Sequence, residues 1–275
     1  MTLDLDRELR LAVELAERAG AVLRGFFGQP LAVERKAGNE PVTEADRAAE
    51  EVVLAGLRAH FPDDGILAEE HADKTSWATY RRVWLVDPLD GTRDFVAGRE
   101  GYSVMIGLLI DGEPVLGVVY QPATGLSYEA AVGQGSFRRH GTERAPLVPT
   151  AIADPAQARL VASRSHRSPR IDAVKDKLQI SDELNVGSVG LKVGLVAAGV
   201  RELYINPDSH CRLWDICAPE AVLTLAGGRM TDLFGDPLRY DDPNQLRVLR
   251  GILATNGACH AAVLEQIAPI FPRPS

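Results

Sequence analysis

The segment Asp87-Pro88-Leu89-Asp90-Gly91-Thr92 has the residue types and spacing of a site for a hard cation beside a phosphate. Its two carboxylates stand three residues apart, and Mg²⁺ prefers oxygen ligands, typically one or two carboxylates plus substrate phosphate and waters. The Leu89 carbonyl can add a ligand, and Gly91 permits close approach. If Gly91-Thr92 also opens a helix, its free N–H groups form an anion site. The segment therefore predicts that a metal ion and a phosphate group bind next to each other at this turn.

An isolated pair of aspartates at this spacing more often only closes a turn, since Asp-Pro and Asp-Gly are common turn formers. Three more acidic positions occupy similar places: Asp46 at an expected helix start, Glu69-Glu70 after the β-prone run 66–68, and Asp215 after Trp214. No single turn explains all of them. A Glu pair alone is usually a solvated charge, but the set favours a site assembled from several segments.

The sequence also predicts the helices and strands that would position these acidic residues. Residues 5–26 carry apolar side chains every three or four residues, which predicts an amphipathic helix. Thr43 followed by Glu44 and Asp46 predicts a second helix that ends near 61–65. The run 83–86 reads as a strand that ends at Asp87-Pro88, because proline cannot continue a central ladder.

The middle of the chain reads as an antiparallel sheet. Residues 103–110 and 115–120 flank a turn, and residues 126–131 extend the sheet. A polar, Pro-rich stretch over 138–155 then separates this sheet from a run at 160–163 and helical patterns around 168–178, 190–199 and 215–227. We expect an N-terminal α+β subdomain over 1–147, with most of the acidic positions, and a C-terminal α/β subdomain over 148–275.

Composition excludes several classes of protein. The 275 residues are 45% hydrophobic and 25% charged, as in ordinary folded domains. A formal charge of −8 repels nucleic acid and anionic lipid, so neither is an expected partner. Three cysteines in no zinc or redox spacing favour a reducing cytoplasm. Apolar runs such as 193–200 are far too short for a membrane span.

Taken together, the acidic segments resemble the inositol monophosphatase superfamily in order and approximate spacing, over residues about 36 to 235. The resemblance rests on Lys36 with Pro41–Asp46, Ala68–Glu70, Trp84–Thr92 and Trp214-Asp215. It implies an α+β fold, layered α/β/α/β/α, with the active site between two subdomains. It also implies Mg²⁺-dependent phosphomonoester hydrolysis with two or three bound ions.

The resemblance assigns roles to these residues. The implied metal ligands are Glu69, Asp87, the Leu89 carbonyl, Asp90 and Asp215, and the implied catalytic residues are Asp46, Glu69 and Thr92. Asp46 orders a water at the metal, and Thr92, hydrogen-bonded to a carboxylate, orients or deprotonates that water. A helix N-cap is the plain alternative for Thr92, and both roles can coexist.

Within the superfamily the chain looks most like the 3′(2′),5′-bisphosphate nucleotidases of sulfur metabolism. These remove the 3′-phosphate of 3′-phosphoadenosine 5′-phosphate (PAP) to give AMP. Gly91–Phe95, Ser163–His166 and Trp214–Glu220 carry this narrower resemblance. The substrate contacts it implies are Gly91, Thr92, Ser163, His166, Ser188 and Lys192, and position 188 is often Gly in the relatives.

Other functions stay open. An inositol monophosphatase or a broad sugar-phosphate phosphatase shares the metal site, as do enzymes acting on fructose 1,6-bisphosphate and histidinol phosphate. The Ser163–His166 element and Lys192 discriminate, because a monophosphate gives them nothing to hold. His166 and Lys192 are otherwise ordinary solvated side chains. A non-catalytic metal- or nucleotide-binding protein is disfavoured, since every acidic position is present. The expected partner is a phosphorylated small molecule, and a homodimer is left open.

Overall fold

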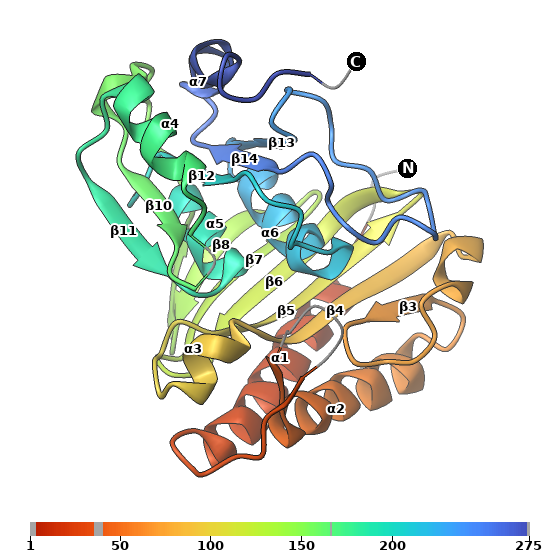
Figure 1. The fold of residues 1–275 in the computed structure, drawn as a ribbon. Helices are drawn as coiled ribbons and strands as arrows, with labels where there is room; N and C mark the ends of the chain where they lie inside the picture. The colour runs from red at the N-terminus through yellow and green to blue at the C-terminus, as the bar shows by residue number, and fades with distance from the viewer. Residues whose placement is uncertain (1–3, 36–40, 166, 274–275) are drawn as a thin grey trace.

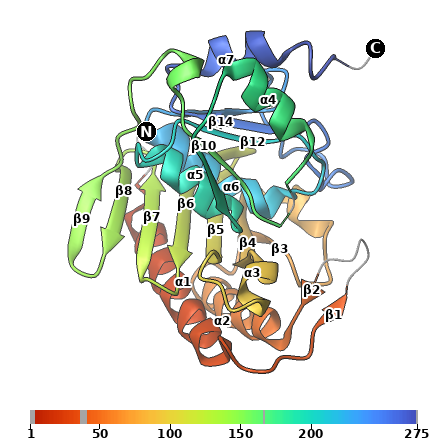
Figure 2. The same ribbon diagram turned by 60° about the vertical axis from the view of Figure 1, so that its left-hand side comes forward.

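The computed structural model describes residues 4–35, 41–165 and 167–273, so Lys36 and His166 lie outside the described residues. Two large β-sheets alternate with three layers of helices, and a third sheet has only two short strands (Figures 1 and 2). The layered α+β fold expected from the sequence is therefore confirmed.

The larger sheet has seven strands in chain order, and its β3–β4 pair is parallel while the other pairs are antiparallel. The strands are β3 (Gly65–Ala68), β4 (Arg82–Asp90), β5 (Ser103–Ile110), β6 (Glu113–Gln121), β7 (Leu126–Ala131), β8 (Gly135–His140) and β9 (Glu143–Pro146). The β5–β6 hairpin and β7 confirm the sequence prediction. The prediction of a linker from residue 138 is wrong, because β8 and β9 form an exposed sheet edge whose polar side chains face water.

Helices α1 (Asp6–Phe26) and α2 (Glu44–His60) cover one face of this sheet. A buried aliphatic and aromatic cluster, which includes Leu15, Leu57 and Trp84, fills the space between them and the strands. Helix α2 starts as its sequence predicts, because the Thr43 hydroxyl accepts a hydrogen bond from the Ala45 N–H and Asp46 caps the Thr43 N–H. The short strands β1 (Glu34–Arg35) and β2 (Pro41–Val42) pair beside α2.

Strand β4 does not end at Asp87-Pro88, and this part of the sequence prediction is wrong. It continues to Asp90, with its pairing to β5 shifted in register between Asp87 and Asp90. Pro88 is tolerated because the parallel partner β3 has already ended opposite Val86 and the register shift removes the need for its N–H in the ladder.

The second face of the large sheet packs against α5 (Val189–Ala197) and α6 (Leu213–Leu225), which form the middle layer. Beyond them lies a five-stranded sheet of β11 (Glu183–Val186), β10 (Leu160–Ser163), β12 (Leu203–Asn206), β14 (Ile252–Thr255) and β13 (Arg229–Thr231). Helices α4 (Arg170–Leu178) and α7 (His260–Ile267) cover its outer face. Short helical turns are η1 (Ser76–Thr79), α3 (Thr92–Val96) and η2 (Pro155–Gln157).

The chain passes from the large to the small sheet between β9 and β10, where we propose the subdomain boundary at residue 147. Helices α5 and α6 come from the second part of the chain but share one apolar core with the large sheet. The two subdomains therefore meet at the layer of α5 and α6, which is part of the apolar core of the large sheet.

Two glycines let α6 lie close to the large sheet. Gly107 and Gly117 are paired across β5 and β6. A Cβ at Gly117 would lie 2.1 Å from the Ala218 carbonyl oxygen, and one at Gly107 would lie 2.6 Å from the Cys217 sulfur. Because Asp215 lies in the first turn of α6, this approach sets how deep Asp215 lies in the molecule.

We expect Gly117→Ala to destabilise the fold by about 1–3 kcal/mol or more, because the added methyl meets helix backbone that cannot rotate away. Urea unfolding measures the change. Gly25→Ala is the matched control, since a Cβ at Gly25 in α1 meets nothing within 4 Å. That substitution should be neutral or stabilise by about 0.5–1 kcal/mol. Equal midpoints for Gly117→Ala and the parent protein would contradict the packing argument.

Candidate active site

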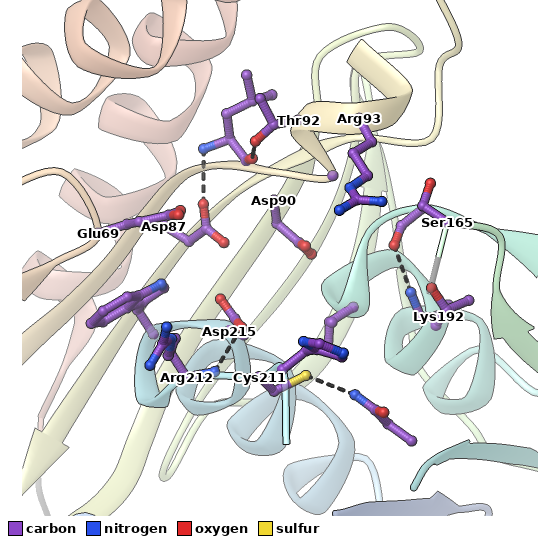
Figure 3. A pocket seen from close by; sticks show the side chains of 18 of the residues that line it. Glu69, Asp87, Asp90, Thr92, Arg93, Ser165, Lys192, Cys211, Arg212 and Asp215 are labelled. Atoms are coloured by element: carbon purple, nitrogen blue, oxygen red, sulfur yellow. Dashed lines mark hydrogen bonds between the residues drawn. The ribbon is translucent and has the colours of Figure 1, made fainter. Parts of the chain in front are cut away.

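A pocket opens where β3 and β4 end, between α3 and the starts of α5 and α6 (Figure 3). One wall carries the four carboxylates that the sequence predicts, those of Glu69, Asp87, Asp90 and Asp215, together with Leu89, Gly91 and Thr92. The facing wall, called the substrate wall here, carries Ser163, Ser165, Gly187, Val189 and Lys192. The structure thus brings together segments that are far apart in the sequence.

The parallel pairing of β3 and β4 explains why the carboxylates meet. The two strands end at the same edge of the sheet, so Glu69 follows β3 beside Asp87 on β4. Gly91 then turns the chain into α3 with φ +93°, and a Cβ there would lie 2.8 Å from the Gly101 carbonyl. Only glycine fits both requirements. Gly91-Thr92 therefore opens a helix, as the sequence suggests.

Three of the carboxylates are held by donors from the chain itself. One oxygen of Asp90 accepts hydrogen bonds from the Ser188 hydroxyl at 2.6 Å and the Gly190 N–H at 2.9 Å. Asp87 accepts from the Leu89 N–H at 2.9 Å, and Asp215 accepts from the Arg212 N–H at 2.8 Å as part of the α6 cap. These bonds fix the orientation of each group before any ligand arrives.

Crowding of buried acids gives the pocket its electrostatic character. Burial, and then the charges of neighbouring carboxylates, raise the pKa of Asp87 and Asp215 well above the usual range. Burial also raises the pKa of Asp90, which the Lys192 ammonium opposes. Such a cluster stays ionised at neutral pH only when cations neutralise it.

The donor set fits a hard divalent cation, because all side-chain donors are carboxylate oxygens and their mutual repulsion calls for positive charge. Across residues 4–35, 41–165 and 167–273, no three His, Cys, Asp or Glu side chains are already arranged to hold a metal ion. The carboxylates nevertheless line one pocket and act on one another's pKa. Bound cations would therefore draw them closer together.

Asp46 is a further carboxylate near the other four, and it contacts Thr92. The Thr92 hydroxyl lies 3.3 Å from one Asp46 oxygen and 3.1 Å from the Leu89 carbonyl oxygen. Asp46 is buried, and its other oxygen accepts from the Thr43 hydroxyl at 2.7 Å. The N-cap of α3 is Gly91, so the alternative of Thr92 as N-cap is wrong. Through its hydrogen bond to Asp46, the Thr92 hydroxyl links that carboxylate to the pocket.

The substrate wall differs in detail from the prediction. Lys192 is buried, its ammonium donates to the Gly187 carbonyl at 2.6 Å, and burial lowers its pKa to about 8. Ser188 is buried with its hydroxyl directed at Asp90, while its neighbours Gly187 and Val189 line the pocket. A substrate contact from Ser188 stays a prediction. Its bond to Asp90 shows a supporting role that the sequence did not indicate.

Further polar residues that sequence reasoning did not select also line the pocket, among them Arg93, Ser165, Asn206, His210 and Arg212. Arg93 lies within the motif Gly91–Phe95, and Ser165 lies within the motif Ser163–His166. Their place inside these motifs is the sequence signal that could have identified them as pocket residues. Arg93 lies between Asp90 and Ser165 in Figure 3.

Comparison with known proteins gives consistent results. Residues 4–270 match the model of the inositol monophosphatase family. The 3′(2′),5′-bisphosphate nucleotidase CysQ of Escherichia coli K12 is 38% identical over 82% of this chain and 91% of that protein. A histidinol-phosphatase of Mycobacterium tuberculosis H37Rv is 34% identical over 94% and 97%. The inositol monophosphatase structure from Anabaena aligns over 97% of both chains with 30% identity and a TM-score of 0.78.

We expect Asp90→Asn to lower kcat at least about 100-fold, because it removes the charge of one of the four clustered carboxylates while keeping its shape. Steady-state kinetics and a thermal melt measure this together. The matched control is Asp63→Asn, in the exposed turn after α2, which should leave kcat unchanged. A purified Asp90→Asn variant that kept more than about a tenth of the activity, a loss under about 1.4 kcal/mol, would refute the assignment.

Proposed function

This chain belongs to the inositol monophosphatase family, and we propose that it is an Mg²⁺-dependent phosphatase that removes the 3′-phosphate of PAP to give AMP. The observation that carries the proposal is the pairing of two unlike walls in one pocket. Four carboxylates face a wall with Lys192, and Arg93 lines the same pocket. The nucleotidase relatives named CysQ support the same substrate.

The carboxylate wall is proposed to bind the phosphate that reacts. Glu69, Asp87, Asp90, Asp215 and the Leu89 carbonyl would hold two or three Mg²⁺ ions, which supply charge stabilisation for the phosphoryl group and an acidified water. Thr92 orients the attacking water through its hydroxyl. Asp46 accepts the proton that Thr92 passes on, across the 3.3 Å contact between them.

The substrate wall is proposed to bind the part of the ligand that does not react. A chain of net charge −8 needs local cations to hold a second phosphate, because metal neutralises only the phosphate that is cleaved. Lys192 and Arg93 supply this charge, and Ser163 and Ser165 supply hydroxyl donors at the end of β10. A monophosphate would leave most of this wall unused. His166, outside the described residues, stays a predicted substrate contact in the Ser163–His166 motif of the sequence.

The second candidate is a phosphatase for histidinol phosphate or for inositol and sugar monophosphates. It is favoured by histidinol-phosphatase relatives at 34% and 38% identity, close to the nucleotidases. A panel of PAP, histidinol phosphate, inositol 1-phosphate and fructose 1,6-bisphosphate decides between them. We expect kcat/KM for PAP to exceed the others at least about tenfold. A higher value for any other member would replace PAP as the substrate.

We also propose a cytoplasmic location. Cys211, Cys217 and Cys259 are buried and free, which suits a reducing compartment. Throughout the described part of the chain, no helix combines the length and hydrophobicity that crossing a bilayer requires.

We expect chelation to abolish activity and Mg²⁺ to restore it. Ca²⁺ should oppose Mg²⁺, because its larger and looser coordination shell spoils the geometry around the phosphate. Phosphate release in excess chelator, with and without each added ion, measures this. Robust hydrolysis without metal would contradict the mechanism, and rescue by Zn²⁺ alone would count against Mg²⁺.

We expect Lys192→Met, which keeps the side-chain length, to raise KM for PAP while hardly changing hydrolysis of a small monophosphate. A charge-assisted contact of about 1.5–3 kcal/mol corresponds to a selective loss of about 10- to 150-fold in kcat/KM. The exposed Lys177→Met on α4 is the control and should change neither substrate. Equal losses on both substrates would show that Lys192 serves the carboxylate wall or the fold instead.

A further inference from the structure

We propose that Asp94 and Arg164 form an ion-pair clamp that fixes the substrate wall against the carboxylate wall, and so act as positioning residues for a substrate that spans both. The inference rests on the proposed function, in which the substrate carries a second phosphate. Neither residue lines the pocket, so neither is expected to touch the substrate.

The contact joins the two halves of the site directly. Asp94 lies on α3, which begins at Thr92 at the end of the Asp87–Thr92 segment, and its side chain is fully buried. One of its oxygens accepts a hydrogen bond from the Arg164 guanidinium at 2.6 Å. Arg164 stands between Ser163 and Ser165, the two hydroxyl residues of the substrate wall. Any shift of α3 relative to the end of β10 must therefore break this pair.

Arg164 also holds the other part of the substrate wall. Its second terminal nitrogen donates to the Asn185 carbonyl at 2.6 Å, and its backbone N–H donates to the Val186 carbonyl at 3.1 Å. Residues 185 and 186 end β11, just before Gly187, Val189 and Lys192. A single guanidinium thus connects α3, the end of β10 and the turn from β11 into α5.

The slot around Asp94 leaves no freedom for the carboxylate to move. A Cβ at Gly101 or at Gly187 would lie 2.5 Å from the Asp94 oxygen that binds Arg164. The Ser188 N–H donates to the Gly101 carbonyl at 2.9 Å and so holds the same two segments together beside Asp94. Two glycines from different segments therefore make room for one buried charge, which needs its partners because an unpaired buried carboxylate is strongly unfavourable.

Arg99 provides a matched comparison within the same contact. It pairs with the other Asp94 oxygen at 2.8 Å, and its side chain is 44% exposed, close to the 40% of Arg164. Arg99 lies in the loop after α3, in the same part of the chain as Asp94. Among the described residues, its side chain pairs with Asp94 and with no residue of the substrate wall. Removing either arginine leaves Asp94 with one cation, but of the two arginines only Arg164 belongs to the segment that carries the substrate wall.

The central experiment compares Arg164→Met with Arg99→Met on PAP and on p-nitrophenyl phosphate, a small monophosphate. We expect Arg164→Met to raise KM for PAP by about 10- to 100-fold, because small displacements between binding groups have effects of this size. Its kcat on p-nitrophenyl phosphate should stay within about threefold. Arg99→Met should change both substrates by less than about threefold.

Two further variants separate positioning from general loss of stability. Arg164→Lys restores one charged contact without the two-nitrogen fork, so its KM for PAP should fall between those of the parent and Arg164→Met. Asp94→Asn keeps the shape of the buried group and should raise KM for PAP as well. In Asp94→Asn/Arg164→Met the increase should be no larger than about that of Arg164→Met alone, since both changes break one contact.

The clamp is wrong if Arg99→Met and Arg164→Met raise KM for PAP equally, if Arg164→Met lowers activity on both substrates alike, or if the effects of Asp94→Asn and Arg164→Met multiply. Failure of the proposed function looks different, because then the parent protein does not hydrolyse PAP. The arginine variants are in that case compared on the best substrate of the panel against p-nitrophenyl phosphate. Equal behaviour of the two variants there also overturns the clamp.

Discussion

The burial of several carboxylates at one point is the constraint on which the rest of this structure depends. Buried acids repel one another and lose hydration, and their raised pKa values record that free-energy cost. The chain offsets part of it by giving Asp87, Asp90 and Asp215 backbone or hydroxyl donors. The remainder calls for bound cations, which ties the stability of the site to the chemistry proposed for it.

The layered fold supplies the rigidity that such a site requires. Parallel pairing brings the ends of β3 and β4 together, so Glu69 and Asp87 come from neighbouring strands of one sheet. Asp215 reaches the same point because Gly107 and Gly117 let α6 approach that sheet closely. A side chain at either glycine would lift the helix, and the cluster of carboxylates would open before any residue of the pocket itself had changed.

The parts of this structure that sequence predicts well are those decided by neighbours along the chain. The capping residues Thr43 and Asp46 are three residues apart, and so are Asp87 and Asp90 at the end of β4, so their patterns can be recognised in the sequence. Contacts between distant segments are not readable in this way. Ser188 and Asp90 are 98 residues apart, and Arg164 and Asp94 are 70 apart. Strand β4 likewise runs past Pro88 because of where its partner β3 ends, which local propensity does not encode.

Substrate choice should then depend on how the second wall is built and held. Relatives named for a nucleotide and for histidinol phosphate resemble this chain to nearly the same degree, so overall similarity does not decide between the two substrates. The substrate wall has its own support, in which Lys192 binds the Gly187 carbonyl and Arg164 binds Asn185. These contacts involve none of the four clustered carboxylates, whereas Ser188 and Gly190, which precede Lys192 in the same segment, donate directly to Asp90. Changes at Ser163, Ser165 or Arg164 can therefore alter recognition with less effect on the buried acids than changes at Ser188 or Gly190, which hold Asp90.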